Sequence, residues 1–107
     1  MNIIICGAGQ VGAHAADVLA RSGHNVTVID TQIERVRAVE DRMDVRTLRG
    51  DAASARVLLE GDTGRGDLLI AATDADDINV LTASVAKGLG CREVIARVHH
   101  RTFFEAR

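Results

Sequence analysis

Short apolar runs alternate along the chain with stretches in which apolar side chains recur every three or four residues. The runs are typical of strands buried on both faces, and the longer spacing is typical of amphipathic helices. The runs predict five strands, at 2–6, 26–30, 45–48, 68–72 and 93–98. Between them the spacing predicts four helices, with core-facing positions at Val11, Ala15, Val18 and Leu19; Ile33, Val36, Val39 and Met43; Val57 and Leu58; and Ile78, Leu81, Val85 and Leu89.

This alternation predicts an α/β fold of the Rossmann type, a doubly wound parallel sheet with helices on both faces. Right-handed crossovers give the strand order 3-2-1-4-5. We expect residues 1–107 to form a single domain. Six strands complete the usual two-halved sheet and the pattern shows five, so the chain is expected to be a piece of a longer one. The tail, 99–107, can start a further helix.

Charge and composition narrow the function. Thirteen basic residues against fifteen acidic ones give a net charge of -2, with no basic block, so we expect no nucleic-acid partner. The longest uncharged stretch, 2–16, is too short to cross a membrane, so we expect no direct insertion. Two cysteines imply no disulfide framework and favour the reducing cytoplasm, and Cys6 is interpreted as a small apolar residue ending a buried strand.

A glycine motif follows the first strand and opens the first helix. In this context Gly7 allows a tight turn, Gly9 lets the backbone approach a pyrophosphate, and Gly12 lets the helix pack on the strand. The free N–H groups and positive end of the helix then face an anion. The alternative is a glycine-rich turn without a ligand. The residues predicted to form the phosphate site are Gly7, Ala8, Gly9, Gln10, Val11 and Gly12.

An acid closes the second strand 18 residues after the last glycine of the motif. Asp30 can accept hydrogen bonds from both ribose hydroxyls of an adenosine and would repel a 2′-phosphate, which favours NAD over NADP. Thr31 is expected to lie beside the same ligand. Asp30 could instead cap the next helix, or do both. Arg35 or Arg37 could restore NADP binding, but both are more simply interpreted as solvated residues on the outer helix face.

Two further loops leave the carboxyl ends of strands, where ligands of open sheets bind. Asp51 and Ala52 are predicted to meet the adenine edge, unless Asp51 only begins the third helix. Thr73 or Asp74 is predicted to cap the fourth helix, with a ligand contact as a second role. The acids that follow do not fit a calcium loop. Adjacent histidines at 99 and 100 point apart and lack a third ligand, so we expect no metal.

The whole chain resembles a known family, the N-terminal nucleotide-binding (KTN or RCK) domains of TrkA, the cytosolic regulatory subunit of Trk-type bacterial potassium uptake. The resemblance implies a domain that binds NAD(H), or ADP or ATP in some members, and gates a Trk/Ktr-type transporter without being an enzyme. Such domains form homo-oligomers (a dimer, or a tetrameric or octameric ring) beneath a membrane transporter subunit, at the cytoplasmic face of the cell membrane. The matching segments are 1–12, 26–30, 49–52, 72–79 and 95–98.

Four residues refine what the resemblance implies. Arg97 matches a basic family position near the ligand or the subunit interface. Gln10 stands where ATP-responsive relatives commonly carry Arg, which favours NAD(H). Phe103 and Phe104 are predicted to lie in a dimer interface, since a five-stranded sheet cannot bury both.

Two other functions fit the glycine motif. One is the cofactor-binding half of an NAD-dependent oxidoreductase, because a fold does not fix a function. The other is the nucleotide-binding domain of a potassium efflux system or antiporter. The segment 73–79, and the lack of a His, Lys or Tyr placed for hydride transfer, favour the regulatory reading over the oxidoreductase.

Overall fold

Five parallel strands form one sheet in the order β3-β2-β1-β4-β5, which confirms the predicted topology. The computed structural model describes residues 1–99. The strands are β1 Asn2–Cys6, β2 Asn25–Asp30, β3 Arg46–Arg49, β4 Leu68–Ala71 and β5 Glu93–Ala96. The helices are α1 Gln10–Arg21, α2 Ile33–Arg42, α3 Ala55–Glu60, α4 Asp76–Leu89 and one turn of 3-10 helix, η1 Thr63–Arg65.

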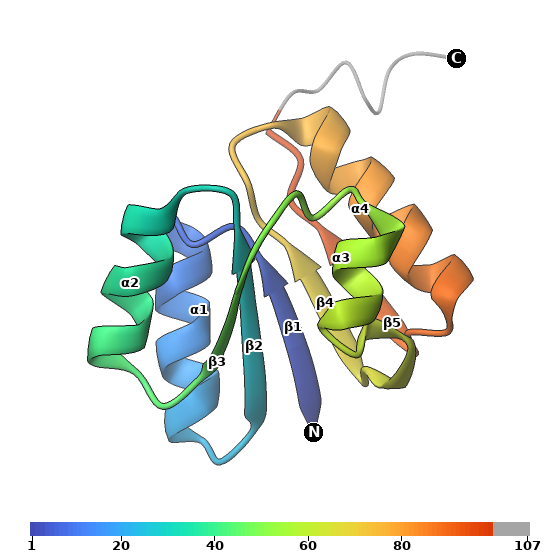
Figure 1. Cartoon of the computed structure of the whole chain (residues 1–107). Coiled ribbons are helices and arrows are strands. Elements are labelled where there is room, and N and C mark those ends of the chain that lie inside the picture. The colour runs from blue at the N-terminus through green and yellow to red at the C-terminus, as the bar shows by residue number, and fades with distance from the viewer. Residues whose placement is uncertain (100–107) are drawn as a thin grey trace.

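The helices lie in two layers, α1 and α2 against one face of the sheet and α3 and α4 against the other (Figure 1). Successive residues of a strand point to opposite faces, so Ile3 and Ile5 enter the α1–α2 core while Ile4 and Cys6 enter the α3–α4 core. This is why the central strand reads as an unbroken apolar run.

The register brings the carboxyl ends of four strands together. Cys6 lies opposite Ile29 of β2 and Ala71 of β4. Just beyond the paired residues, the N–H of Gly7 donates to Ile29, that of Ala72 to Cys6, and that of Gly50 to Asp30, at 2.8 to 3.0 Å. The loops after β1, β2, β3 and β4 therefore leave the sheet side by side.

The predicted core-facing stripes of two helices are partly wrong. Val11 and Val18 of α1 are 45% and 47% exposed, and Leu81 of α4 is 50% exposed. The fully buried positions of both helices are instead small or polar, while Leu19 of α1 and Val85 and Leu89 of α4 pack against the core and are partly buried. The buried positions are Gly12 and Ala16 on α1, and Asp76, Asn79, Thr82, Ala83 and Ala86 on α4.

The other helices follow the pattern, with Val36 and Val39 of α2 and Val57 and Leu58 of α3 buried as predicted. Boundaries shift by one or two residues, most clearly in β5, which ends at Ala96 rather than at 98. Within residues 1–99 no helix is both long and apolar enough to cross a bilayer. The tail with Phe103 and Phe104 lies outside the described residues, so its predicted helix and interface stay predictions.

Candidate functional site

The loop after β1 needs glycine at two positions for reasons internal to the chain. Gly7 has a φ of +99°, and a Cβ there would lie 2.9 Å from the backbone nitrogen of Thr73. A Cβ on Gly12 would lie 1.7 Å from the carbonyl oxygen of Gly7. Any larger residue at Gly12 would push α1 off the loop. These two glycines set the turn and bring the start of α1 over the ends of the strands.

Gly9 has no such internal reason to be glycine. Its φ of -73° suits any residue, and the atoms nearest to a Cβ there belong to the Arg35 guanidinium, at an ordinary 3.5 Å. Gly9 is the N-cap of α1 and offers no side-chain cap, and the first turn of α1 contains no acid. The first turn thus presents N–H groups and the positive helix end to a cavity of about 110 Å³.

Asp30 is held by the backbone on both of its oxygens. Oδ2 accepts from the N–H of Ala8 at 2.7 Å, and Oδ1 accepts from the N–H of Gln32 at 2.8 Å. The side chain is 5% exposed. Asp30 therefore ties the glycine loop to the residue before α2. It does not cap this helix as the alternative interpretation expected, because the N-cap is Gln32 and has no side-chain cap. Each carboxylate oxygen keeps a second lone pair for a further donor.

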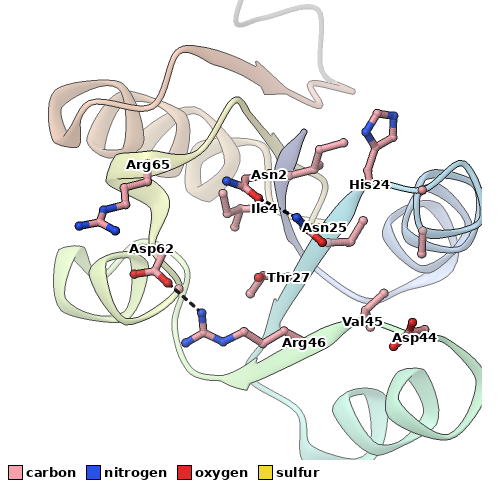
Figure 2. Close-up of a pocket in the computed structure, with 15 residues that line it drawn as sticks. Asn2, Ile4, His24, Asn25, Thr27, Asp44, Val45, Arg46, Asp62 and Arg65 are labelled. Carbon is pink, nitrogen blue, oxygen red and sulfur yellow. Dashed lines mark hydrogen bonds and ion pairs between the residues drawn. The ribbon is translucent and has the colours of Figure 1, made fainter.

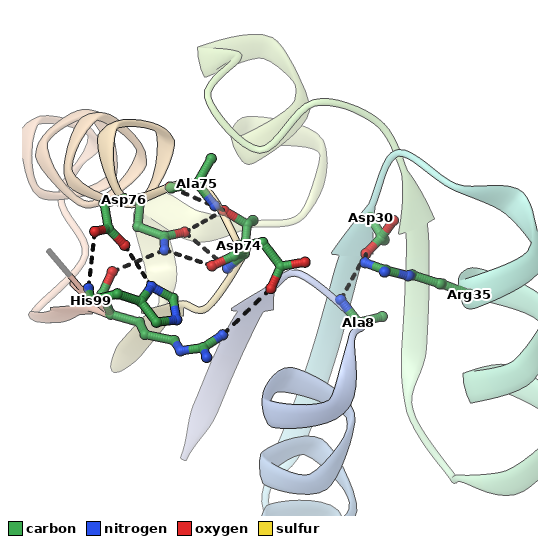
Figure 3. Close-up of polar contacts among 10 residues, drawn as sticks. Ala8, Asp30, Arg35, Asp74, Ala75, Asp76 and His99 are labelled. Atoms are coloured by element: carbon green, nitrogen blue, oxygen red, sulfur yellow. Dashed lines mark hydrogen bonds and ion pairs between the residues drawn. The ribbon is translucent and has the colours of Figure 1, made fainter.

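Arg35 lies at this site, and its interpretation as a solvated residue on the outer face of the helix is wrong. Figure 3 shows the guanidinium beside Asp30, with Nη1 3.8 Å from Oδ2. The same guanidinium is the group nearest to where a Cβ on Gly9 would lie. Arg35 sits in the first turn of α2, where the helix passes the glycine loop. The hydrophobic pattern gave no sign of this, because it reports the side of α2 that faces the core.

Two cavities at the carboxyl ends of the strands bring most of the predicted residues together. One of about 370 Å³ is within the usual size range of ligand pockets. Its lining includes Gly7, Asp30, Thr31, Asp51, Ala52, Thr73 and Asp74. The smaller one of about 110 Å³ is lined by Gly9, Gln10, Val11, Arg35, Ala72, Thr73, Asp74 and Arg97. Of the predicted site, Ala8 and Gly12 line neither cavity.

A buried amide that the sequence analysis missed organises the β4 side of the site. Asn79 is fully buried, and its Oδ1 accepts from the backbone N–H of Thr73 at 2.9 Å and from the Thr73 hydroxyl at 2.7 Å. Its Nδ2 donates to the carbonyl oxygens of Thr73 and Arg97, each at 2.9 Å. Asn79 therefore fixes both the loop after β4 and the exit of β5. The sequence pattern gave no signal for this, because it placed Ile78 and Leu81, and not Asn79, on the core-facing side of the helix.

A second contact joins the same two segments. His99 Nδ1 lies 2.7 Å from Oδ1 of Asp76, and the backbone N–H of His99 donates to Oδ2 of Asp76 at 3.0 Å (Figure 3). Asp76 is buried at the start of α4. His99 therefore anchors the chain after β5. Residues 1–99 contain no cluster of three or more His, Cys, Asp or Glu side chains arranged to hold a metal.

The predicted side-chain cap of α4 is wrong. The N-cap is Ala75, which has no capping group. The Thr73 hydroxyl instead accepts from the N–H of Ala75, and Asp74 turns outward, 88% exposed, with its Oδ1 3.8 Å from Nη1 of Arg97. At the other loop, Asp51 accepts from the N–H of Ala53 at 2.9 Å while Ser54 caps α3.

Cys6 ends β1 directly before the glycine loop and is inert there. Its thiol is completely buried, and burial, with a smaller contribution from Cys91, raises the pKa of Cys6 from 9.0 to about 12. A thiol that stays protonated is a poor nucleophile and a poor metal ligand. The structure agrees with a packing role for Cys6.

A larger cavity, of about 570 Å³, lies at the opposite edge of the sheet. Figure 2 shows it between the amino-terminal ends of the strands, bordered by the Arg46–Asp62 ion pair and by Asn2 and Asn25. The predicted site residues are absent from its lining. Ligands of open α/β sheets bind at the carboxyl ends, so the edge that carries the glycine loop is the candidate site.

Comparison of the sequence with known proteins assigns the chain to a family. A sequence model of the TrkA-N domain matches residues 3–106. The chain belongs to the TrkA-N domain family. Relatives of this TrkA-N domain include the Trk system potassium uptake protein TrkA of Halomonas elongata, 42% identical over 83% of the chain. A TrkA homolog of Archaeoglobus fulgidus is 36% identical over 98% of it. The chain spans only 20% and 25% of the lengths of these two relatives.

Solved structures with the same fold come from several protein classes. The C-terminal domain of Kef from Shewanella denitrificans, described as bound to AMP, superposes with a TM-score of 0.81 at 24% identity, over 94% of this TrkA-N domain and 61% of that chain. The NAD(P)-binding domain of an exopolyphosphatase-related protein from Archaeoglobus fulgidus superposes with a TM-score of 0.80 at 14% identity. The match covers 96% of this TrkA-N domain and 77% of that chain. At these identities the likeness establishes the Rossmann-type fold alone.

Proposed function

We propose that this TrkA-N domain binds an adenine nucleotide, with NAD(H) as the first candidate, and is the cytosolic regulatory part of a potassium uptake transporter. The proposal that a ligand binds here rests on Gly9. It is glycine although neither its backbone angles nor its neighbours require it, and it opens an uncapped helix start onto a cavity. A close approach by ligand phosphate gives this position a reason to lack a side chain.

The site suggests how such a ligand would lie. The adenosine half suits the 370 Å³ cavity, with its ribose at Asp30 and its adenine near Asp51 and Ala52. The phosphates suit the first turn of α1 and the guanidinium of Arg97. Asp30 would receive the ribose hydroxyls on its remaining lone pairs, since both oxygens already hold one backbone N–H.

The transport role comes from the relatives, which are named as Trk potassium uptake proteins. In this proposal the domain works in a homo-oligomer attached to a membrane transporter subunit on the cytoplasmic side. The nucleotide acts as an effector and is not turned over. It favours one arrangement of paired domains and so biases the transporter, by an amount set by its differential affinity for the two arrangements.

Calorimetric titration of the protein with NADH, NAD, NADPH, ADP and ATP tests the ligand. We expect NADH and NAD to bind more tightly than NADPH, because the Asp30 carboxylate disfavours a 2′-phosphate. Tighter binding of ATP than of NADH would contradict the role given to Gln10. Absence of binding for all five would overturn the nucleotide proposal.

Potassium flux tests the regulatory role. The full-length protein that contains this domain would be reconstituted with its transporter in vesicles, with and without nucleotide. We expect the nucleotide that binds most tightly in calorimetry to change the potassium flux of the wild type. The flux of a Gly9→Ala variant should not respond to the same nucleotide. If the protein binds nucleotide and the potassium flux does not change with it, the gating role is contradicted.

A further inference from the structure

We infer that Arg35 is a phosphate-binding residue, whose guanidinium rests against Asp30 in the free protein and moves to the diphosphate of a bound nucleotide. The inference rests on the proposed nucleotide site and adds a residue to it. It also names the feature of the ligand that the site recognises, two linked phosphates rather than adenosine alone.

The position of Arg35 is the first argument. Its guanidinium lies in front of Gly9, at the point where ligand phosphate would approach the loop. Arg35 lines both the 370 Å³ and the 110 Å³ cavities, so it stands at the junction between the adenosine half and the phosphate half. A side chain only three residues into α2 reaches this junction because α2 starts beside the glycine loop.

The weakness of its present contact is the second argument. Arg35 Nη1 is 3.8 Å from Asp30 Oδ2, beyond hydrogen-bond distance, whereas backbone N–H groups hold the same carboxylate at 2.7 and 2.8 Å. Five guanidinium N–H donors cannot be satisfied across that gap. The side chain is 39% exposed, so it is free to turn toward a better acceptor.

The partner across the cavity is the third argument. Arg97 lines the same 110 Å³ space from β5, with its Nη1 3.8 Å from the exposed carboxylate of Asp74. Figure 3 shows Arg35 on one side of the start of α1 and Asp74 on the other. Two guanidinium groups therefore flank the first turn of α1. Guanidinium forks match phosphate oxygens in pairs, and a diphosphate is long enough to engage both.

A different role for Arg35 makes a different prediction. If the guanidinium only neutralised Asp30, its loss would alter ribose recognition and change the affinities for ADP and adenosine by the same factor. If it binds phosphate, its loss weakens ADP and leaves adenosine unchanged. The ratio of the two affinities therefore separates the roles.

The test is the affinity of wild type, Arg35→Gln and Arg37→Gln for ADP, and for adenosine by competition with a fluorescent ADP analogue. Arg37 is the matched control, an exposed arginine on the same helix. We expect Arg35→Gln to bind ADP about 10-fold more weakly, with adenosine within about 2-fold of wild type and Arg37→Gln unchanged. Arg35→Lys should recover part of the loss, since it keeps the charge without the planar fork.

Equal losses for ADP and adenosine in Arg35→Gln would overturn the inference, and so would wild-type affinity for ADP. Both outcomes leave the nucleotide site standing, because the wild type binds in each. A wild type that binds neither ADP nor adenosine is a separate result. It would overturn the proposed function, and the role of Arg35 with it. Thermal unfolding of each variant shows that a lost affinity is not a lost fold.

Discussion

The carboxylate of Asp30 accepts a hydrogen bond from the backbone N–H of Ala8, with 2.7 Å between nitrogen and Oδ2. The residue that closes β2 thus holds the middle of the glycine loop, and its other oxygen holds the N–H of Gln32 at the start of α2. One buried carboxylate shapes the glycine loop and lines the cavity proposed for the ribose. The proposed function therefore makes Asp30 important both for stability and for ligand binding.

Replacing Asp30 should therefore affect the fold as well as the ligand. Asp30→Ala leaves the Ala8 and Gln32 N–H groups without their acceptor, and we expect a loss of about 1–3 kcal/mol in the free energy of unfolding. Asp30→Asn keeps one acceptor oxygen and should lose less. Urea denaturation measures both. An Asp30→Ala protein as stable as wild type would show that the two contacts contribute nothing.

Asn79 should be among the most sensitive positions on α4. Asn79→Ala removes the partner of the Thr73 N–H and of the Thr73 and Arg97 carbonyls in the interior, and we expect a loss of about 3 kcal/mol. Ser84→Ala, at an exposed position of the same helix, is the control and should change stability by under about 0.5 kcal/mol. Similar denaturation midpoints for the two variants would contradict the network.

Two glycines should respond in opposite directions to alanine. Gly12→Ala places a methyl group 1.7 Å from the Gly7 carbonyl oxygen and should prevent the native packing of α1. Gly88 lies in α4 with open space around it, and Gly88→Ala should stabilise the protein by about 0.5–1 kcal/mol through helix propensity. Circular dichroism melts compare them. A folded Gly12→Ala protein with the wild-type melting temperature would refute the close approach.

The raised pKa of Cys6 predicts that the protein loses stability at alkaline pH. Its pKa is about 12 in the folded chain and about 9 when unfolded, so above pH 9 the unfolded state loses a proton that the folded state keeps. Stability from this group is fully present below pH 9 and falls as pH rises toward 12. Between pH 8.5 and 10 we expect Cys6 to account for about 1 kcal/mol.

The check is urea denaturation of wild type and Cys6→Ala at those two pH values. From pH 8.5 to pH 10 the wild type should lose about 1 kcal/mol more stability than Cys6→Ala does. The difference between the two proteins therefore shrinks if the wild type starts as the more stable one, and widens if it starts as the less stable one. Parallel pH profiles would mean that the thiol ionises equally in both states.

The order of the strands could be predicted, because apolar runs mark the strands and the handedness of the crossovers orders them. The position of the glycine motif then showed at which end of the sheet the loops meet. The two corrections to the helices share one cause. The sequence pattern marks large apolar residues as buried, whereas α1 and α4 turn Ala16 and Ala83 to the sheet and leave Val18 and Leu81 exposed. A pattern of large apolar residues gives no weight to Gly, Ala, Thr or Asn, which hold most of the buried positions of these two helices.

The site could be predicted only as far as backbone position determines it. Asp30 and Thr73 follow strands directly, so topology places them. Arg35 reaches the glycine loop by the direction of a long side chain, and Asn79 reaches Arg97 across a gap of eighteen residues. Neither relation has a local signature in the chain.

The most direct test of the account is the binding of NADH to Gly9→Ala. The backbone at Gly9 accepts alanine and the nearest contact is an ordinary 3.5 Å, so we expect a folded protein that melts close to wild type. The added methyl group projects into the space proposed for phosphate, so NADH affinity should fall by at least about 10-fold, while Gly88→Ala binds as wild type does. A folded Gly9→Ala protein that binds NADH with wild-type affinity would contradict the placement of nucleotide phosphate at this loop.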